Sequence, residues 1–317
     1  MPSFSRRIRN RLKHGLHTMF ALGQRAGWDI LPRHFYSSIP DLRRLQQTDY
    51  WRQPSSMIGV AGTEIDSQLQ FLRQCCQPVL REHVRNLAIH RHACQQNGEV
   101  GYGLVEADFL FCFVATKRPK RIIQVGCGVS TAVILMAAKQ AEYQPELVCI
   151  EPFPTRFLRN AAADRRITLI AERAEQVDLG TLTNLESGDF FFVDSTHAVK
   201  PGGEVNRIIL EVLPRLRPDC FVHFHDINFP YDYSTGVLAE LFFPAENTLL
   251  HAFLVNNARC SLAVSLSMLH YACPQELQSA LPNYQPAAMQ NGLHAATDGG
   301  GHFPSATYLL IEAPRFR

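Results

Sequence analysis

The sequence predicts an α/β fold, in which a doubly wound, mostly parallel seven-stranded sheet carries helices on both faces. Apolar strand candidates alternate with helical stretches through the middle of the chain, which is the order of a parallel sheet. The strand candidates are 121–126, 146–151, 166–171, 189–194 and 219–225, and the helical stretches are 131–142, 154–164 and 203–215. Two later strand candidates, 259–266 and 306–313, are expected to complete the sheet.

The composition supports one large domain with appended segments, because 46% of the 317 residues are hydrophobic and only 19% are charged. We expect residues 119–317 to form that domain and residues 29–118 to form an irregular and helical extension packed on it. Residues 1–28 form a basic N-terminal arm. The loop 282–304 is rich in Gly, Pro and polar residues, so it is expected to be a lid or a disordered segment.

The positive charge is concentrated at the N-terminus. The basic residues before Asp29 are Arg6, Arg7, Arg9, Arg11, Lys13 and Arg25, and no acidic residue accompanies them. The remaining chain has 25 basic against 29 acidic residues, so the main body is not expected to bind nucleic acid. The arm is either a peripheral contact for an anionic membrane or a partner, or a solvated helix.

Nine cysteines are scattered through the chain without a CxxC pair. An odd, scattered set is typical neither of a disulfide framework nor of a structural zinc site. The sequence therefore favours a reducing compartment and a cytoplasmic location. The chain leaves open whether it forms a homo-oligomer.

The turn after the first strand candidate carries a binding signal. Gly126 and Gly128 allow a sharp turn and a close approach of the backbone to a ligand, and Ser130 is expected to cap the helix that follows. Glu151 ends the next strand candidate about twenty residues later, where a carboxylate can accept both hydroxyls of a ribose. These residues predict a nucleotide-like cofactor.

A second group of polar residues follows the fourth and fifth parallel strands. Asp194 and His197 come after one strand, and His225 and Asp226 come after the next, so all four are expected at the same sheet edge as the glycine turn. The two carboxylates suit Mg²⁺ or Mn²⁺, and His197 suits a general base. The alternative is that the acids cap the backbone or bind cofactor, and that His223 and His225 are ordinary strand residues hydrogen-bonded in the core.

These motifs resemble the class I S-adenosylmethionine-dependent methyltransferases, in particular the branch of macrocin-type and catechol-type O-methyltransferases. The resemblance rests on VGCGVST at 125–131, IEPF at 150–153, GDFFFVDSTH at 188–197 and LPRLRPDCFVHFHDI at 213–227, with NGEVGYGLVEADFL at 97–110 as a flank. It implies a Rossmann-like methyltransferase fold. It also implies O-methylation of a small-molecule or glycosyl acceptor.

The resemblance assigns roles to individual residues. It implies a cofactor site made by Gln124, Gly126, Gly128, Ser130, Thr131, Glu151 and Asp194. It implies catalytic roles for His197 and Asp194, and a metal held by Asp194 and Asp226. In the sequence, Gln124 replaces the usual acid, and Ile227 follows Asp226 where a further ligand is usual, so His225 or Asn228 would complete the metal shell.

Two other functions stay open at this stage. A nicotinamide-dependent oxidoreductase uses the same sheet and glycine turn, although it leaves DSTH and HDI unexplained. A catalytically degenerate domain that binds S-adenosylmethionine and acts as a scaffold is the third possibility.

Overall fold

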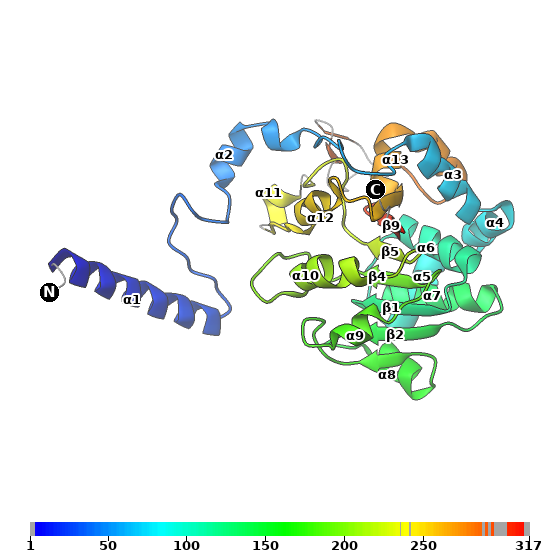
Figure 1. The fold of residues 1–317 in the computed structure, drawn as a ribbon, viewed down its shortest axis with the longest axis horizontal. Coiled ribbons are helices and arrows are strands. Elements are labelled where there is room, and N and C mark those ends of the chain that lie inside the picture. Colours follow the sequence, from blue (N-terminus) through cyan, green and yellow to red (C-terminus); the bar gives the residue numbers. More distant parts are fainter. Residues whose placement is uncertain are drawn as a thin grey trace. The chain divides into compact units, whose positions relative to one another are not determined.

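The computed structural model describes residues 4–234, 236–240, 242–286, 289–290, 293–294 and 303–313. The chain divides into two compact units between Gln47 and Thr48. The first unit contains the long helix α1 (Phe4–Arg25) and the short helix α2 (Leu42–Gln47) (Figure 1). Within the described residues, no helix has the length and apolar character needed to cross a bilayer.

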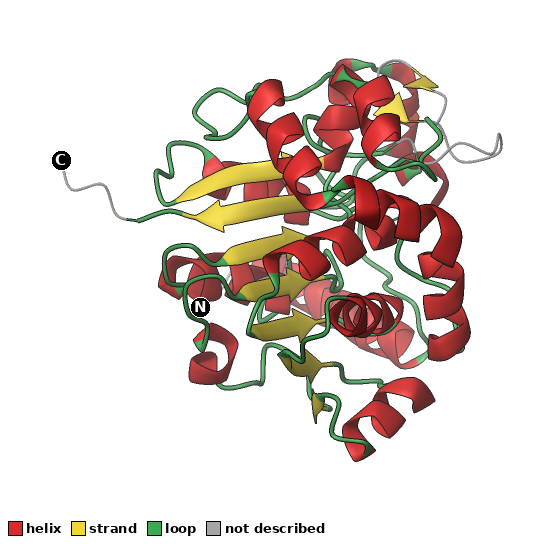
Figure 2. Ribbon diagram, turned by 90° about the vertical axis from the view of Figure 1, so that its right-hand side faces the viewer, coloured by secondary structure: helices red, strands yellow, loops and turns green. Residues whose placement is uncertain are grey.

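The second unit is built on a seven-stranded sheet with the order β3-β2-β1-β4-β5-β9-β6 (Figure 2). The first five strands in this order are parallel, and β9 runs antiparallel to both β5 and β6. The strands are β1 (Arg121–Val125), β2 (Glu146–Ile150), β3 (Thr168–Ile170), β4 (Phe190–Val193), β5 (Phe221–Phe224), β6 (Cys260–Ser265) and β9 (Thr307–Ile311). This architecture confirms the predicted fold class, a Rossmann-like methyltransferase fold.

The central strands are apolar on both faces because each face is covered by its own layer of helices. In β4, Phe190 and Phe192 enter one hydrophobic core, and Phe191 and Val193 enter the other. The helices that supply the first core are α3 (Ile65–Cys75), α4 (Pro78–Leu87), α5 (Ile89–Asn97), α6 (Leu104–Lys117), α7 (Val129–Gln140), α8 (Arg156–Ala163), α13 (Leu266–Ala272) and α14 (Pro274–Ala280).

The second core lies under α9 (Leu179–Thr183), α10 (Glu204–Arg207), a π-helix (Ile208–Val212), a 3-10 turn (Leu213–Arg215) and α12 (Glu246–Leu254). A further short helix is α11 (Val237–Glu240), and a 3-10 turn spans Tyr50–Arg52.

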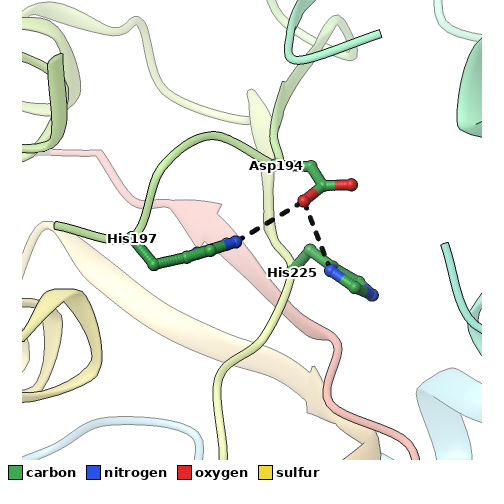
Figure 3. Close-up of side chains that lie close together, drawn as sticks. All are labelled: Asp194, His197 and His225. Atoms are coloured by element: carbon green, nitrogen blue, oxygen red, sulfur yellow. Dashed lines mark ion pairs between the residues drawn. The ribbon is translucent and has the colours of Figure 1, made fainter. Parts of the chain in front are cut away.

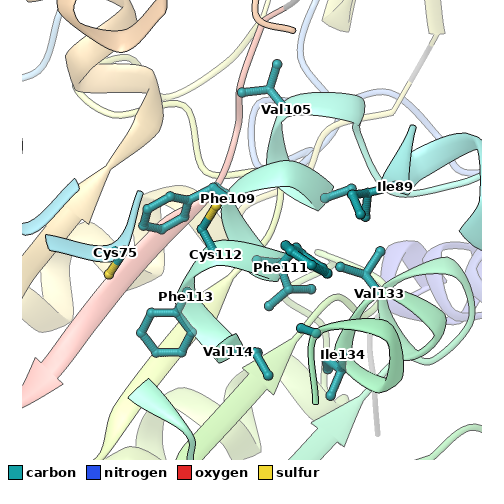
Figure 4. Packing of buried hydrophobic residues seen from close by; sticks show 14 of the residues in the cluster. Cys75, Ile89, Val105, Phe109, Phe111, Cys112, Phe113, Val114, Val133 and Ile134 are labelled. Carbon is teal, nitrogen blue, oxygen red and sulfur yellow. The ribbon is translucent and has the colours of Figure 1, made fainter. Parts of the chain in front are cut away.

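Helix α6 is the centre of the first core (Figure 4). Ten of its fourteen residues are buried, which agrees with the largely apolar composition of 104–117. Phe113 contacts the rings of Phe190, Phe221 and Tyr308, so this helix joins β4, β5 and β9. The strands β4 and β5 therefore pack against a buried, apolar helix.

Ala61 and Gly62 lie against β6, which is an edge strand of the sheet. Leu262 of β6 donates its backbone N–H to the carbonyl of Ala61, at 2.9 Å. A side chain at Gly62 would lie 2.2 Å from the Leu262 carbonyl oxygen, so the two backbones approach more closely than any other residue would allow. The irregular extension thus protects an edge strand from unwanted pairing.

Several predictions about elements were wrong in detail. The stretch 203–215 is not one α-helix, because it passes from α10 through a π-helix to a 3-10 turn at Pro214. The helices α9, α13 and α14 were missed, although Asp178, Ser265 and Pro274 mark their starts.

The loop 282–304 is described only in part. Within it, β7 (Met289–Gln290) pairs with β8 (Leu293–His294). Most of the segment expected to be a lid or disordered lies outside the described residues.

Candidate active site at the carboxyl ends of the parallel strands

The glycine turn joins the end of β1 to the start of α7. Gly126 has a φ of +79°, and a Cβ atom there would lie 1.7 Å from the carbonyl oxygen of Asp194. Asp194 in turn donates its backbone N–H to the Val125 carbonyl, at 2.9 Å. The absence of a side chain at Gly126 therefore lets the ends of β1 and β4 come together.

Glu151 is held in place by the same turn. Its carboxylate accepts the backbone N–H of Cys127 at 3.2 Å and that of Phe153 at 2.9 Å. Each oxygen retains a further lone pair, so the group can still accept hydroxyls of a ligand. The turn and Glu151 thus form one ordered structure before any ligand arrives.

Three predicted cofactor residues are hydrogen-bonded to one another. Gln124, which is fully buried, donates to Ser130 Oγ at 2.7 Å and accepts from Thr131 Oγ1 at 2.9 Å. Thr131 Oγ1 also accepts the N–H of Gly128, at 3.1 Å. Gly128 is the N-cap of α7, so the expectation that Ser130 caps this helix was wrong.

A cavity of about 280 Å³ opens in front of the turn. It is near the lower end of the volumes usual for small-molecule sites. Its lining includes Gly126, Gly128, Ser130, Glu151 and Asp194, as the sequence predicted, and also Asn97, Glu99, Val100, Gly101, Tyr102, Cys127, Val129, Phe153 and Thr155. Gln124 and Thr131 are absent from this lining because both side chains are turned inward to brace the loop.

The polar residues after β4 and β5 form a cluster beside this cavity, whose lining includes Asp194. Figure 3 shows three of them, Asp194, His197 and His225. Asp194 Oδ1 lies 3.6 Å from His197 Nε2 and 3.3 Å from His225 Nδ1. Asp226 is 3.4 Å from each of the same two nitrogens. The structure therefore brings together all four residues that the sequence placed at this edge.

The backbone at the cluster is in an uncommon conformation. His197 and Asp226 have φ values of +56° and +54°, a region that non-glycine residues rarely occupy. Such strain persists where surrounding structure holds it, and it is concentrated at functional sites. The conformation of His197 and Asp226 directs both side chains toward the same gap beside Asp194.

Sequence reasoning missed Glu246, the first residue of α12. Its side chain is buried, and its Oε2 lies 2.7 Å from His197 Nδ1. The other carboxylate oxygen, Oε1, is buried and has no hydrogen-bond partner within the described part of the chain. No signal in the local sequence indicates this contact, because 49 residues separate Glu246 from His197.

The three carboxylates change the acid-base behaviour of the cluster. Burial by itself would lower the pKa of His197, but the hydrogen bonds to Asp194 and Glu246 outweigh it and raise the pKa to about 10. Burial opposes the ionised form of Asp226, yet the His225 imidazole lowers its pKa to about 2. The ligand-free site therefore holds positive charge between its acids.

His223 belongs to the core. It lies between the rings of Phe192 and Tyr308, and its Nε2 is 3.2 Å from the hydroxyl of Tyr102. Burial lowers its pKa well below the usual value, so this imidazole is neutral. The ring of Tyr102 also packs on His225, with centroids 4.8 Å apart, which links the cavity wall to the cluster.

The donor set fits a divalent cation. One donor atom from each of Asp194, His197 and His225 lies within 4.8 Å of the others. Cations bound at about 2.1 Å separate adjacent donors by roughly 3.0–3.5 Å, close to the distances seen here. His225 Nδ1 is ion-paired with Asp194 and Asp226, whereas its Nε2 is buried and has no hydrogen-bond partner among the described residues. A buried donor or acceptor without a partner is costly unless a ligand satisfies it.

Comparison with known proteins gives one family match. Residues 123–227, about a third of the chain, match the family model of a methyltransferase domain. An uncharacterized protein of Archaeoglobus fulgidus is 26% identical over 164 residues, which are 49% of this chain and 73% of that protein.

Two solved structures are also similar. The Podospora anserina methyltransferase PaMTH1, bound to S-adenosylhomocysteine, is 16% identical and has a TM-score of 0.41, covering 90% of this chain and 99% of its own. The O-methyltransferase TomG of Streptomyces achromogenes, involved in tomaymycin synthesis and bound to S-adenosylmethionine, is 17% identical and has a TM-score of 0.43. That match covers 71% of this chain and 90% of TomG.

Proposed function

We propose that this chain, whose match to a methyltransferase domain supports a class I S-adenosylmethionine-dependent methyltransferase, methylates a hydroxyl oxygen of a small or glycosyl acceptor. One observation carries the proposal. Asp194 lines the cavity at the glycine turn and is also the centre of the Asp–His cluster. A methyl donor in the cavity and a hydroxyl at the cluster would therefore meet at one residue.

The cavity has the groups that the methyl donor requires. The backbone of the turn lies open at Gly126 and Gly128, and Glu151 presents a fixed carboxylate to the ribose hydroxyls. Phe153 lines the same cavity, and its side chain is 76% exposed, so its ring offers a stacking surface for the purine.

The cluster has the groups that a hydroxyl acceptor requires. When bound, S-adenosylmethionine supplies a methyl group whose bond to sulfur breaks as the oxygen–carbon bond forms, with the electron pair retained by sulfur. His197 Nε2 faces the gap between Asp194 and Asp226, and it would take the proton that the acceptor oxygen loses in the fraction of the enzyme whose imidazole is neutral. The rigid strand ends hold the acceptor in line, and positioning of this kind provides much of the rate.

The proposed metal ligands are Asp194, Asp226 and His225, with Asp226 in place of the His197 of the three-residue donor set, because His197 is assigned the role of base. A Mg²⁺ or Mn²⁺ ion there would orient the acceptor and lower the pKa of its hydroxyl. His197 is hydrogen-bonded to Glu246 through Nδ1, and positive charge held by the acids would lower its raised pKa, so that Nε2 could accept a proton.

Cofactor titration tests the proposal. Saturating S-adenosylmethionine or S-adenosylhomocysteine should raise the melting temperature by several degrees, because ligand at 100 times Kd stabilises by about 2.7 kcal/mol. Glu151→Ala should abolish this shift. The control Glu211→Ala removes an exposed acid on a helical turn outside the site and should retain it.

The alternatives give different results in the same experiment. Stabilisation by NADH or NADPH alone would contradict the proposal and favour the oxidoreductase. Binding of S-adenosylmethionine, with no S-adenosylhomocysteine released on any glycosyl or phenolic acceptor, would favour the degenerate scaffold. Release of S-adenosylhomocysteine with a hydroxylated acceptor would support O-methylation.

A further inference from the structure

We propose that residues 4–39 form a peripheral membrane-binding element that docks on an anionic lipid surface. The proposal is independent of the methyltransferase site and rests on the unit formed by the first 47 residues. It commits to a lipid interface because that surface matches both the charge and the apolar groups of this element.

In the part of helix α1 whose side chains the structure describes, apolar and basic residues lie on different faces. Leu16, Met19 and Gly23 have the spacing i, i+3 and i+7, which places them in one stripe. Leu16 and Met19 are 40% and 42% exposed. Lys13 and His17 lie outside the stripe and are exposed. In the sequence, apolar residues at 4, 8 and 12 continue the spacing of position 16.

The chain after α1 extends the apolar stripe. The helix ends with Gly27 at a φ of +83° and with the Trp28 N–H bonded to the Gly23 carbonyl at 2.8 Å. A Cβ atom at Gly23 would lie 3.2 Å from the side chain of Ile30. Ile30 therefore packs against the stripe at its C-terminal end.

The same segment exposes aromatic side chains. Trp28, Phe35 and Tyr36 are 71%, 94% and 87% exposed, and Leu31 is half exposed. Large amphipathic rings such as those of Trp and Tyr favour the headgroup region of a bilayer. A helix with one apolar and one basic face, followed by exposed aromatics, is typical of an interfacial anchor.

Charge distinguishes a lipid surface from a second copy of the chain. Six basic residues and no acidic residue precede Asp29, so two copies of this element would repel each other. An anionic leaflet attracts the same residues, and the apolar stripe can then enter the interface.

The test uses the full chain and lipid vesicles. The protein should sediment with vesicles containing about one third phosphatidylglycerol and much less with pure phosphatidylcholine, and rising salt should weaken the binding. The double variant Leu16→Ser, Met19→Ser should bind at least about tenfold more weakly, since burial of each side chain contributes to partitioning. Lys13→Glu should reduce binding to the anionic vesicles selectively.

A matched control separates this effect from general surface polarity. Val79→Ser removes an exposed apolar residue from α4, in the second unit, and should leave vesicle binding unchanged. The melting transition of every variant verifies that the fold is intact. Equal binding by the wild type and the stripe variant would overturn the proposal, as would no binding to anionic vesicles. Concentration-dependent dimerisation that the stripe variant abolishes would identify a second copy as the occupant and likewise overturn it.

Discussion

The contact between Glu246 and His197 decides which imidazole nitrogen faces the acidic gap. Glu246 Oε2 lies 2.7 Å from Nδ1, so the Nδ1 proton is held by that carboxylate and Nε2 is directed toward Asp194 and Asp226. We regard Glu246 as a positioning residue, because it acts through His197 and is buried beneath it.

Glu246→Gln tests this arrangement. The amide can donate to Nδ1, which reverses the tautomer and places a proton on Nε2, so kcat should fall about a hundredfold with little change in KM. Nitrogen chemical shifts of His197, recorded above pH 10 where the wild-type ring is neutral, should report the change of tautomer without any acceptor. Affinity for S-adenosylhomocysteine should stay the same, and an unaltered His197 spectrum would contradict the prediction.

Substitutions of the two histidines distinguish the general base from the metal ligands. His225→Gln should weaken Mn²⁺ binding, whereas His197→Gln should retain the metal and lose turnover. Isothermal titration with Mn²⁺ measures the first effect and product formation measures the second. Loss of Mn²⁺ binding in His197→Gln would show that His197 is itself a ligand.

Among the elements, the turn between β1 and α7 has the strictest steric requirement. Gly126 combines a positive φ with backbone contact to Asp194 at the end of β4. Gly188 has a similar φ of +84° but open space around its Cβ position. Comparing substitutions at the two glycines therefore separates the free-energy cost of the positive φ from the cost of a clash with Asp194.

Gly126→Ala should lower the free energy of unfolding by about 2–4 kcal/mol, and Gly188→Ala by only about 1 kcal/mol. Only Gly126→Ala should also weaken cofactor binding, since it moves Asp194. Urea denaturation and ligand titration measure the two effects. Equal losses of stability in the two variants would refute the steric argument.

Helices and strands were predicted correctly where the hydrophobic pattern was long. They were missed where a capping residue, and not a hydrophobic pattern, determines where a short helix begins. The strands of the parallel sheet were predicted because runs such as FFFV in β4 are apolar on both faces. α9 was missed because its five residues, LGTLT, show no periodicity, and its start depends on the Asp178 cap.

Stability of the whole molecule should depend on pH through the Asp–His cluster. The pKa of His197 is raised from 6.5 to about 10, so its contribution is fully present below pH 6.5 and is lost as the pH rises through 10. Asp226, with its pKa lowered from 3.8 to about 2, contributes above pH 3.8 and loses that contribution as the pH falls through 2.

Chemical denaturation of the metal-free wild type and His197→Gln should show this dependence. The stability difference between the two proteins should shrink from pH 7 to pH 9.5, because only the wild type releases the His197 proton when it unfolds. Raised pKa values of buried thiols, such as that of Cys75, affect both proteins alike and cancel in the difference. A stability difference that stays constant with pH would contradict this role of the Asp–His cluster.

The sequence by itself determined the sheet, its apolar strands and the group of polar residues at their carboxyl ends. It could do so because strand periodicity and the order of strand, turn and helix are local properties, and parallel strands bring their ends to one edge. The positions of Asp194, His197, His225 and Asp226 followed from that rule.

Only the tertiary structure decided what each side chain contacts. It turned Gln124 and Thr131 into braces of the glycine loop, brought Glu246 from a distant helix to His197, and placed Tyr102 between the cavity and the cluster. These contacts join residues far apart in the chain or select one orientation of a buried side chain. Packing and hydrogen-bond satisfaction across the whole fold settle such choices, and no local pattern records them.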